Sequence, residues 1–232
     1  MQERRPQGDP RVPDEEATAS ADGTGTQRLE AFSDAVMAIA ITILVLEFKV
    51  PEGPPEATDW RLGAALVAQW PSYVAYVMSF VVLGVTWASH HRVFQYIVRF
   101  DWPFLLLNLL FLLIVAFVPY PTALLAKYLS SETGRRIAVM FYGGMMTVFA
   151  LTYNAIWWYA SSRNRLLANN LDERGVRRLT WELAVAAVGY PVSMGIAFLQ
   201  PLLSLVMFVA LALFSAIAPA IATRPVARNQ RT

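Results

Sequence analysis

The feature that most constrains this chain is a series of apolar segments whose lengths match the thickness of a lipid bilayer. A helix rises about 1.5 Å per residue, so about 20 residues cross the roughly 30 Å hydrocarbon core. Six such segments can be read, at about residues 30–50, 62–96, 102–119, 135–160, 178–199 and 201–219. They predict an all-α membrane protein with six transmembrane helices. Pro71 and Pro191 predict kinks within two of them.

Composition excludes several classes of protein. Of the 232 residues, 56% are hydrophobic and 16% are charged, which is typical of a multi-pass membrane protein. There is no cysteine, and the two histidines, His90 and His91, lie about 100° apart on a helix, so they cannot hold one metal ion from a single face. The net charge of +2 is close to neutral, and no phosphate loop or nucleophile–base set is present. We therefore expect no enzyme activity, no cofactor, no fixed metal site and no nucleic-acid partner.

Both ends of the chain are polar. Residues 1–27 contain too few large apolar side chains to offset the entropy of ordering, so we expect a disordered tail. The transmembrane domain then covers 28–223, and a short basic tail covers 224–232. If the N-terminus is cytosolic, most arginines fall on the inside, and the outside segments carry only Lys49, Arg61, Lys127, Arg135 and Arg136. This bias predicts that both termini are cytosolic.

The first apolar segment, Ala35 to Leu46, is shorter than a membrane span. It crosses the bilayer only if Ser33, Asp34 and Glu47 lie at or inside the membrane edges. Carboxylates at that depth normally face protein or water rather than lipid. We therefore expect this helix at the centre of an assembly, where a pore would be lined.

One stripe of this helix follows helical spacing and consists of Ala35, Ile39, Thr42 and Leu46. Small, branched and hydroxyl side chains of this kind suit the wall of a pore in a homo-oligomer. The stripe also suits ordinary helix packing, because the rest of the helix is just as apolar. Spacing alone favours packing and leaves the pore wall open as the alternative.

Ser33 and Asp34 are expected in the first turn of this helix. Their oxygens would cap free N–H groups there, and the helix dipole favours a carboxylate at that end. Arg28 either pairs with Asp34 or Glu30 or serves as one more positive charge on the inner side of the membrane.

His90 and His91 are expected at the cytosolic end of the second helix, on the same membrane face as Asp34. A contact between Asp34 and the histidines would form a buried polar latch. The alternative is a solvated, interfacial His-His-Arg end. Asn108, Asn154 and Gln200 are isolated polar residues, for which we expect interhelical hydrogen bonds.

Three motifs together resemble a known family. They are Arg28-x-x-x-Phe32-Ser33-Asp34 followed by Ile39, Thr42, Leu46 and Glu47, then Trp87-x-x-His90-His91-Arg92-x-Phe94, and then Pro119-x-Pro121-Thr122. With them, residues 28–223 resemble the transmembrane protein 175 family of endolysosomal and prokaryotic potassium channels. The resemblance implies a homotetramer in which the first helices surround a potassium-permeable pore.

The resemblance also implies roles for individual residues. Ile39 matches an apolar constriction that gates by dewetting, Thr42 matches a hydroxyl layer linked to potassium preference, and Leu46 matches a further apolar ring. A polar network that holds the first helix in place is matched by Arg28, Ser33, Asp34, His90 and His91. The expected protein is a passive channel with modest preference for K⁺ over Na⁺. Its partners would be other copies, lipid and K⁺ in a prokaryotic plasma membrane.

A rival function is a proton-coupled or other secondary transporter that uses Asp34 and His90. Transporters often carry internal repeats and helices broken near the midplane of the membrane. Repeats are not evident in this sequence, whereas Pro71 and Pro191 leave broken helices open.

Overall fold

The computed structural model describes the backbone of residues 15–51, 59–162, 165–167 and 173–222. Within these ranges the chain is helical apart from short connections and one isolated bridge between Ile97 and Leu167. The elements, in chain order, are α1 Glu15–Ile43, the 3₁₀ turn η1 Leu44–Glu47, α2 Asp59–Ala68, α3 Trp70–Tyr96, α4 Trp102–Phe117, α5 Pro119–Tyr128, α6 Gly134–Ser161, α7 Glu173–Ala197 and α8 Pro201–Ala222.

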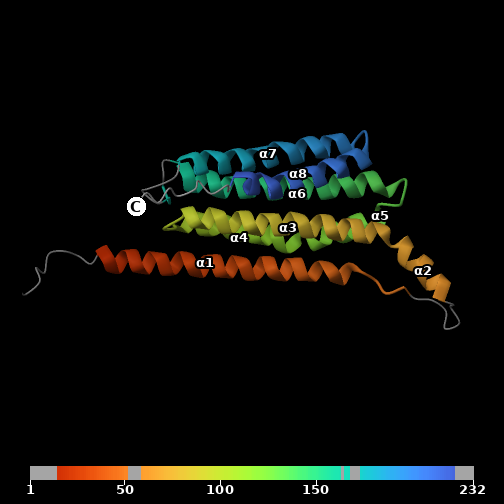
Figure 1. The fold of residues 1–232 in the computed structure, drawn as a ribbon, viewed down its shortest axis with the longest axis horizontal. Coiled ribbons are helices and arrows are strands. Elements are labelled where there is room, and N and C mark those ends of the chain that lie inside the picture. Colours follow the sequence, from red (N-terminus) through yellow and green to blue (C-terminus); the bar gives the residue numbers. More distant parts are fainter. Residues whose placement is uncertain (1–14, 52–58, 163–164, 168–172, 223–232) are drawn as a thin grey trace, which may run out of the picture.

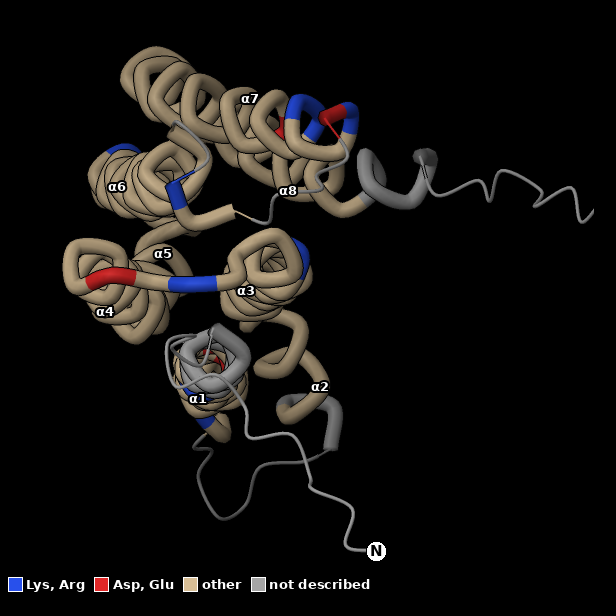
Figure 2. The backbone as a smooth tube through the Cα atoms, turned by 90° about the vertical axis from the view of Figure 1, so that its left-hand side faces the viewer, with Lys and Arg blue, Asp and Glu red and all other residues tan. Residues whose placement is uncertain are grey.

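The helices run nearly parallel to one long axis and stack in layers (Figure 1). Helices α6, α7 and α8 form one layer, α3 and α4 form the next, and α1 lies on the outer side of α3 and α4. Viewed along the axis, α3 lies between α1 and α8 (Figure 2). Helix α1 therefore packs on one side only and leaves its other side uncovered within the subunit.

Five segments in the described part of the chain are long and apolar enough to cross a membrane: Gly25–Glu47, Trp70–Tyr96, Trp102–Tyr128, Gly134–Ser161 and Glu173–Ala197. This confirms an all-helical, multi-pass architecture. The sixth predicted span corresponds to α8. The apolar stretch of this helix, Pro201–Ala216, is shorter than the other five segments.

Helix α1 begins at Glu15, well before the predicted start near residue 30. Thr26 is buried, and Gly25 lets the ring of Phe100 approach so closely that an added Cβ would lie 3.0 Å from it. The backbone of residues 15–27 is helical, within the segment that we expected to be a disordered tail. Residues 1–14 and the predicted basic tail 224–232 lie outside the described residues.

The third span does not end at Pro119 as predicted. Val118 keeps helical angles, φ −53° and ψ −37°, and α5 continues the same span to Tyr128. Pro119 and Pro121 occupy the first turn of α5, where a missing N–H leaves no hydrogen bond unmade. Pro71 likewise lies in the first turn of α3, so the predicted second helix divides at Gln69 into α2 and α3.

Candidate functional site

Helix α1 has two distinct faces. The face packed against α3 and α4 carries Leu29, Ser33, Met37, Ala40 and Leu44, all buried at helical spacing. The opposite face carries the predicted stripe, and all four of its residues, Ala35, Ile39, Thr42 and Leu46, are exposed in the single subunit. The exposed fraction is 58% for Ile39 and 74% for Leu46. Packing within the subunit therefore does not explain the stripe.

The outer end of the stripe differs from a regular α-helix. Helix α1 ends at Ile43, and Leu46 lies in the 3₁₀ turn η1. Phe48 follows and packs between Tyr73 and Tyr76, with ring centroids 5.4 and 5.1 Å away. These aromatic contacts hold the end of the first span against α3, which keeps Leu46 on the uncovered side.

Thr42 is the hydroxyl residue of the exposed face. Its hydroxyl donates a 2.9 Å hydrogen bond to the carbonyl oxygen of Ile39 on the preceding turn. The hydroxyl proton is thereby held against the helix, and the lone pairs of Oγ1 remain directed away from that bond. Thr42 can therefore present an oxygen ligand to a cation.

A fully buried chain of hydrogen bonds joins α1, α4 and α3. Asn108 donates from Nδ2 to Ser33 Oγ at 2.9 Å, and Ser33 donates to the carbonyl of Leu29 at 2.9 Å. The Oδ1 atom of Asn108 accepts from His90 Nε2 at 3.3 Å, and the ring of His90 stacks on Phe94. We call Ser33, Asn108 and His90 the buried anchor, because all three are inaccessible to solvent.

The carboxylates of α1 bind partners other than those expected. Asp34 Oδ1 accepts from Trp87 Nε1 at 3.0 Å, and Glu30 accepts from His91 Nδ1 at 2.8 Å. The direct contact between Asp34 and the histidines is thus not formed, because His90 faces α4 while His91 faces Glu30. Arg28 is exposed and makes no ion pair with Asp34 or Glu30 among the residues described.

Two expectations about these residues change with the structure. Ser33 and Asp34 do not cap a helix, since α1 begins many residues earlier and both lie in its interior. The histidines form a polar connection to α1, but through Asn108 and Glu30. Asn108 makes the interhelical bonds that the sequence suggested, and so does Asn154, which donates to the carbonyl of Leu183 at 2.8 Å.

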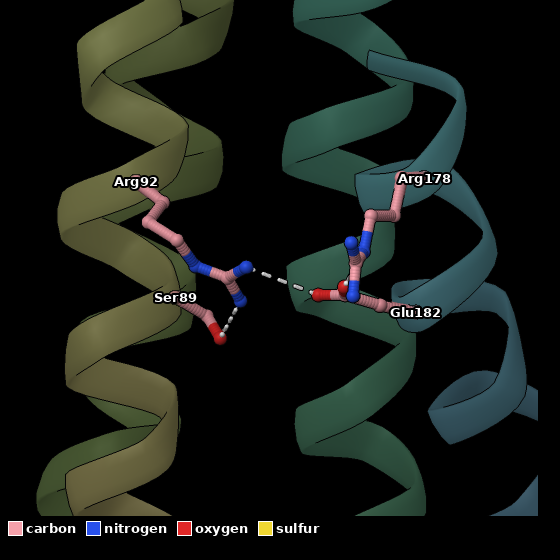
Figure 3. A network of polar contacts seen from close by, with 4 residues as sticks. All are labelled: Ser89, Arg92, Arg178 and Glu182. Carbon is pink, nitrogen blue, oxygen red and sulfur yellow. Dashed lines mark hydrogen bonds and ion pairs between the residues drawn. The ribbon is translucent and has the colours of Figure 1, made fainter. Parts of the chain in front are cut away.

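Sequence reasoning missed a second polar cluster, shown in Figure 3. Glu182 on α7 is buried and accepts from Arg92 on α3 at 3.1 Å and from Arg178 at 3.0 Å. Arg92 also donates to Ser89. The available signal was a carboxylate inside an apolar helix, four residues after an arginine.

The comparisons with known proteins bear on the same helices. A family model described as "Endosomal/lysosomal potassium channel TMEM175" matches residues 28–119, which hold the buried anchor and the exposed stripe. "Potassium channel B446_29190" of Streptomyces collinus is 43% identical over 187 residues, which are 81% of this chain and 89% of that protein. The chain belongs to the TMEM175 family.

Further TMEM175 relatives cover nearly the same length. "Potassium channel Cha6605_3372" of Chamaesiphon minutus is 40% identical over 83% of this chain and 94% of that protein. A crystal structure described as a lysosomal potassium-selective channel TMEM175 homolog from Chamaesiphon minutus has a TM-score of 0.74 and 36% identity. It covers 84% of this chain and 97% of that one. The likeness therefore covers most of this chain and nearly all of each relative.

Proposed function

We propose that this chain forms a homotetrameric, potassium-permeable cation channel whose pore is lined by the exposed face of α1. The observation that carries the proposal is the two-faced packing of α1: one face is held by α3 and α4, and the other is left uncovered with a stripe of apolar and hydroxyl residues. Four copies meeting at an axis would cover this face and enclose a conduit.

The family supports this function. Bacterial TMEM175 relatives of almost the same length are named potassium channels, and the protein of the similar crystal structure is described as potassium-selective. Transport is then passive, so the chain is not an enzyme and K⁺ is the permeant ion rather than a cofactor.

In this pore, Ile39 forms the narrowest apolar ring, Leu46 forms a second ring nearer the outside, and Thr42 lies between them. Apolar rings exclude water and gate by dewetting, whereas hydroxyl oxygens replace part of the hydration shell of the ion. No layer of backbone carbonyls is involved, so we propose only a modest preference for K⁺ over Na⁺.

The buried anchor fixes the rotation of α1 about its own axis. Ser33 and the stripe lie on opposite faces, so holding Ser33 against Asn108 directs the stripe away from the bundle. Asp34 and the pair of Glu30 with His91 add contacts at the edges of the same interface. Arg28 remains at the inner mouth, where it shapes the potential that an entering ion meets.

We also propose six spans per subunit, with α8 as the sixth, and both termini on the cytosolic side of a prokaryotic plasma membrane. An even number of spans places both termini on one side. The arginine bias assigns that side to the cytosol.

The proposal is tested with purified protein in two ways. Native mass spectrometry in mild detergent should give a tetramer, and protein in liposomes under a potassium gradient alone should set a voltage that follows the potassium equilibrium. A stable monomer would refute the α1-lined pore. A proton flux in fixed ratio to the solute would instead indicate the rival transporter, against which the complete burial of His90 argues.

Replacing Thr42 with Ala is expected to lower the preference for K⁺ over Na⁺ without abolishing current. The substitution deletes one oxygen ligand per subunit and leaves the apolar rings intact. The reversal potential under bi-ionic K⁺/Na⁺ conditions measures the change. Thr152→Ala is the matched control, because Thr152 makes the same bond to a preceding carbonyl but lies on α6. If Thr42→Ala and Thr152→Ala had the same selectivity for K⁺ over Na⁺, Thr42 would not line the pore.

A further inference from the structure

A small cavity with polar walls lies inside the bundle, between α3, α6, α7 and α8. Its volume is about 50 Å³. Each of the four helices contributes a polar side chain to its wall: Ser89 from α3, Tyr153 and Asn154 from α6, Glu182 from α7 and Ser215 from α8. The cavity is distinct from the proposed pore, since α3 lies between α1 and α8 (Figure 2).

The charged part of this wall is a buried carboxylate. Arg92 donates to Glu182 at 3.1 Å and to Ser89 at 3.0 Å, so it links two groups of the wall across the gap between α3 and α7 (Figure 3). Arg178 donates to the other carboxylate oxygen of Glu182 at 3.0 Å. Each carboxylate oxygen can accept a second hydrogen bond. A carboxylate inside a membrane span normally faces protein or water, and Glu182 has protein on one side and the cavity on the other.

The hydroxyl of Tyr153 is an unsatisfied group of the same wall. It is buried and has no hydrogen-bond partner among the residues that the structure describes. The ring of Tyr153 stacks on Phe111, and the hydroxyl lies within electrostatic range of Arg92, whose partners Ser89 and Glu182 line the cavity. A buried donor that is left unpaired is costly, so this hydroxyl indicates a bound partner.

Two further groups of the wall have spare hydrogen-bonding capacity. Asn154 uses Nδ2 for its bonds to the carbonyls of Ala150 and Leu183, and its Oδ1 accepts no bond within the described part of the chain. Ser89 accepts from Arg92 and donates its own proton to none of the described residues. Donors and acceptors around one small space are what a buried water requires, since such a water makes about three hydrogen bonds.

The size and charge of the cavity select among ligands. Sites for organic ligands of drug size occupy about 300–1,000 Å³, which is several times the volume of this cavity. A metal ion is disfavoured by the two arginines beside Glu182, and the described residues contain no group of three side chains that could hold one. Water fits, because each molecule needs about 10–15 Å³ of such space.

We propose that this cavity binds a cluster of about three or four water molecules. The Tyr153 hydroxyl donates to one of them, and the waters donate in turn to Asn154 Oδ1 and to Glu182. The cluster completes the hydrogen bonds of a phenol and a carboxylate within the membrane span, and it joins α3 to the layer of α6, α7 and α8. It lies outside the proposed pore, so the proposal does not depend on channel function.

Radiolytic labelling tests for the bound water. X-rays split water into hydroxyl radicals where the water is bound, so side chains beside ordered internal water are modified, and mass spectrometry of the purified protein measures the rate. Tyr153 should be modified several-fold faster than Tyr142. Tyr142 is the matched control, because it is a buried tyrosine on the same helix whose hydroxyl bonds to Ser79. Equal rates at the two tyrosines would overturn the proposal.

A pair of alanine variants locates the labelled water. Ala186 lines the cavity, so Ala186→Leu fills it and should slow the labelling of Tyr153 to the rate of Tyr142. Ala187→Leu makes the same change at the next residue, outside the cavity lining, and should leave the labelling of Tyr153 fast. Unchanged labelling in Ala186→Leu would place the water elsewhere and refute the assignment to this cavity.

Thermal unfolding of Tyr153→Phe gives a second, independent test. The variant keeps the ring and removes the hydroxyl. If the hydroxyl binds water, the melting temperature should fall, as it should in Tyr142→Phe, because each variant loses a hydrogen bond. In a dry cavity the same change would delete an unpaired buried donor and raise the melting temperature. An unchanged or raised melting temperature in Tyr153→Phe would therefore count against bound water.

Discussion

Replacing Ile39 with Asn is expected to raise conductance and to lower the preference for K⁺ over Na⁺. In the proposed pore, four isoleucine side chains converge and exclude water, so an ion entering the ring loses hydration without gaining ligands. Asparagine is of similar size and supplies an amide oxygen, which wets the ring. Single-channel current and bi-ionic reversal potential in planar bilayers measure the two effects.

The control for this experiment is Ile137→Asn. Ile137 is 71% exposed on α6, in the layer farthest from α1, so the same chemical change is made on a surface that the proposal assigns to lipid. That variant should conduct like the original protein. If Ile39→Asn also left conductance and reversal potential unchanged, Ile39 would pack between subunits and the pore would lie elsewhere.

Replacing Asn108 with Ala is expected to cause the largest loss of stability among polar substitutions in the first three spans. The change leaves His90 Nε2 without its acceptor and Ser33 Oγ without its donor, both in a fully buried position. A buried polar group left unpaired costs about 1–3 kcal/mol. Because the anchor also orients α1, we expect the tetramer to dissociate at a lower temperature and the current to fall.

Asn154→Ala is the matched control for that experiment. Asn154 is only partly buried, and its amide donates to the carbonyls of Ala150 and Leu183, which lie inside helices. Those carbonyls keep a backbone partner when the side chain is removed. Size-exclusion chromatography after heating, with tetramer content as the readout, compares the two variants. Equal losses would show that the buried anchor has no special role in holding α1.

The sequence determined the features that depend on neighbouring residues. Apolar length predicted the spans, because a bilayer requires a fixed number of helical residues. The stripe through Ile39 and Thr42 followed from helical spacing, and its exposure on one side of α1 is what the structure shows. Isolated polar residues in apolar surroundings indicated interhelical hydrogen bonds, as Asn108 and Asn154 make.

Local rules failed where packing overrides them. Pro119 was expected to end the third span, but a proline in the first turn of a following helix leaves no bond unmade, so the chain continues to Tyr128. Near its start, α1 contacts Phe100 at Gly25, and Phe100 is distant in sequence.

Only the tertiary structure decided which polar groups meet. Asp34 binds Trp87, His91 binds Glu30, and Ser33 reaches His90 through Asn108. Helical spacing gives the direction of each side chain about its own helix, but the rotation of one helix against another is set by the packing of whole faces. The burial of one face of α1, and with it the exposure of the stripe, is therefore a property of the assembled bundle and not of the first helix by itself.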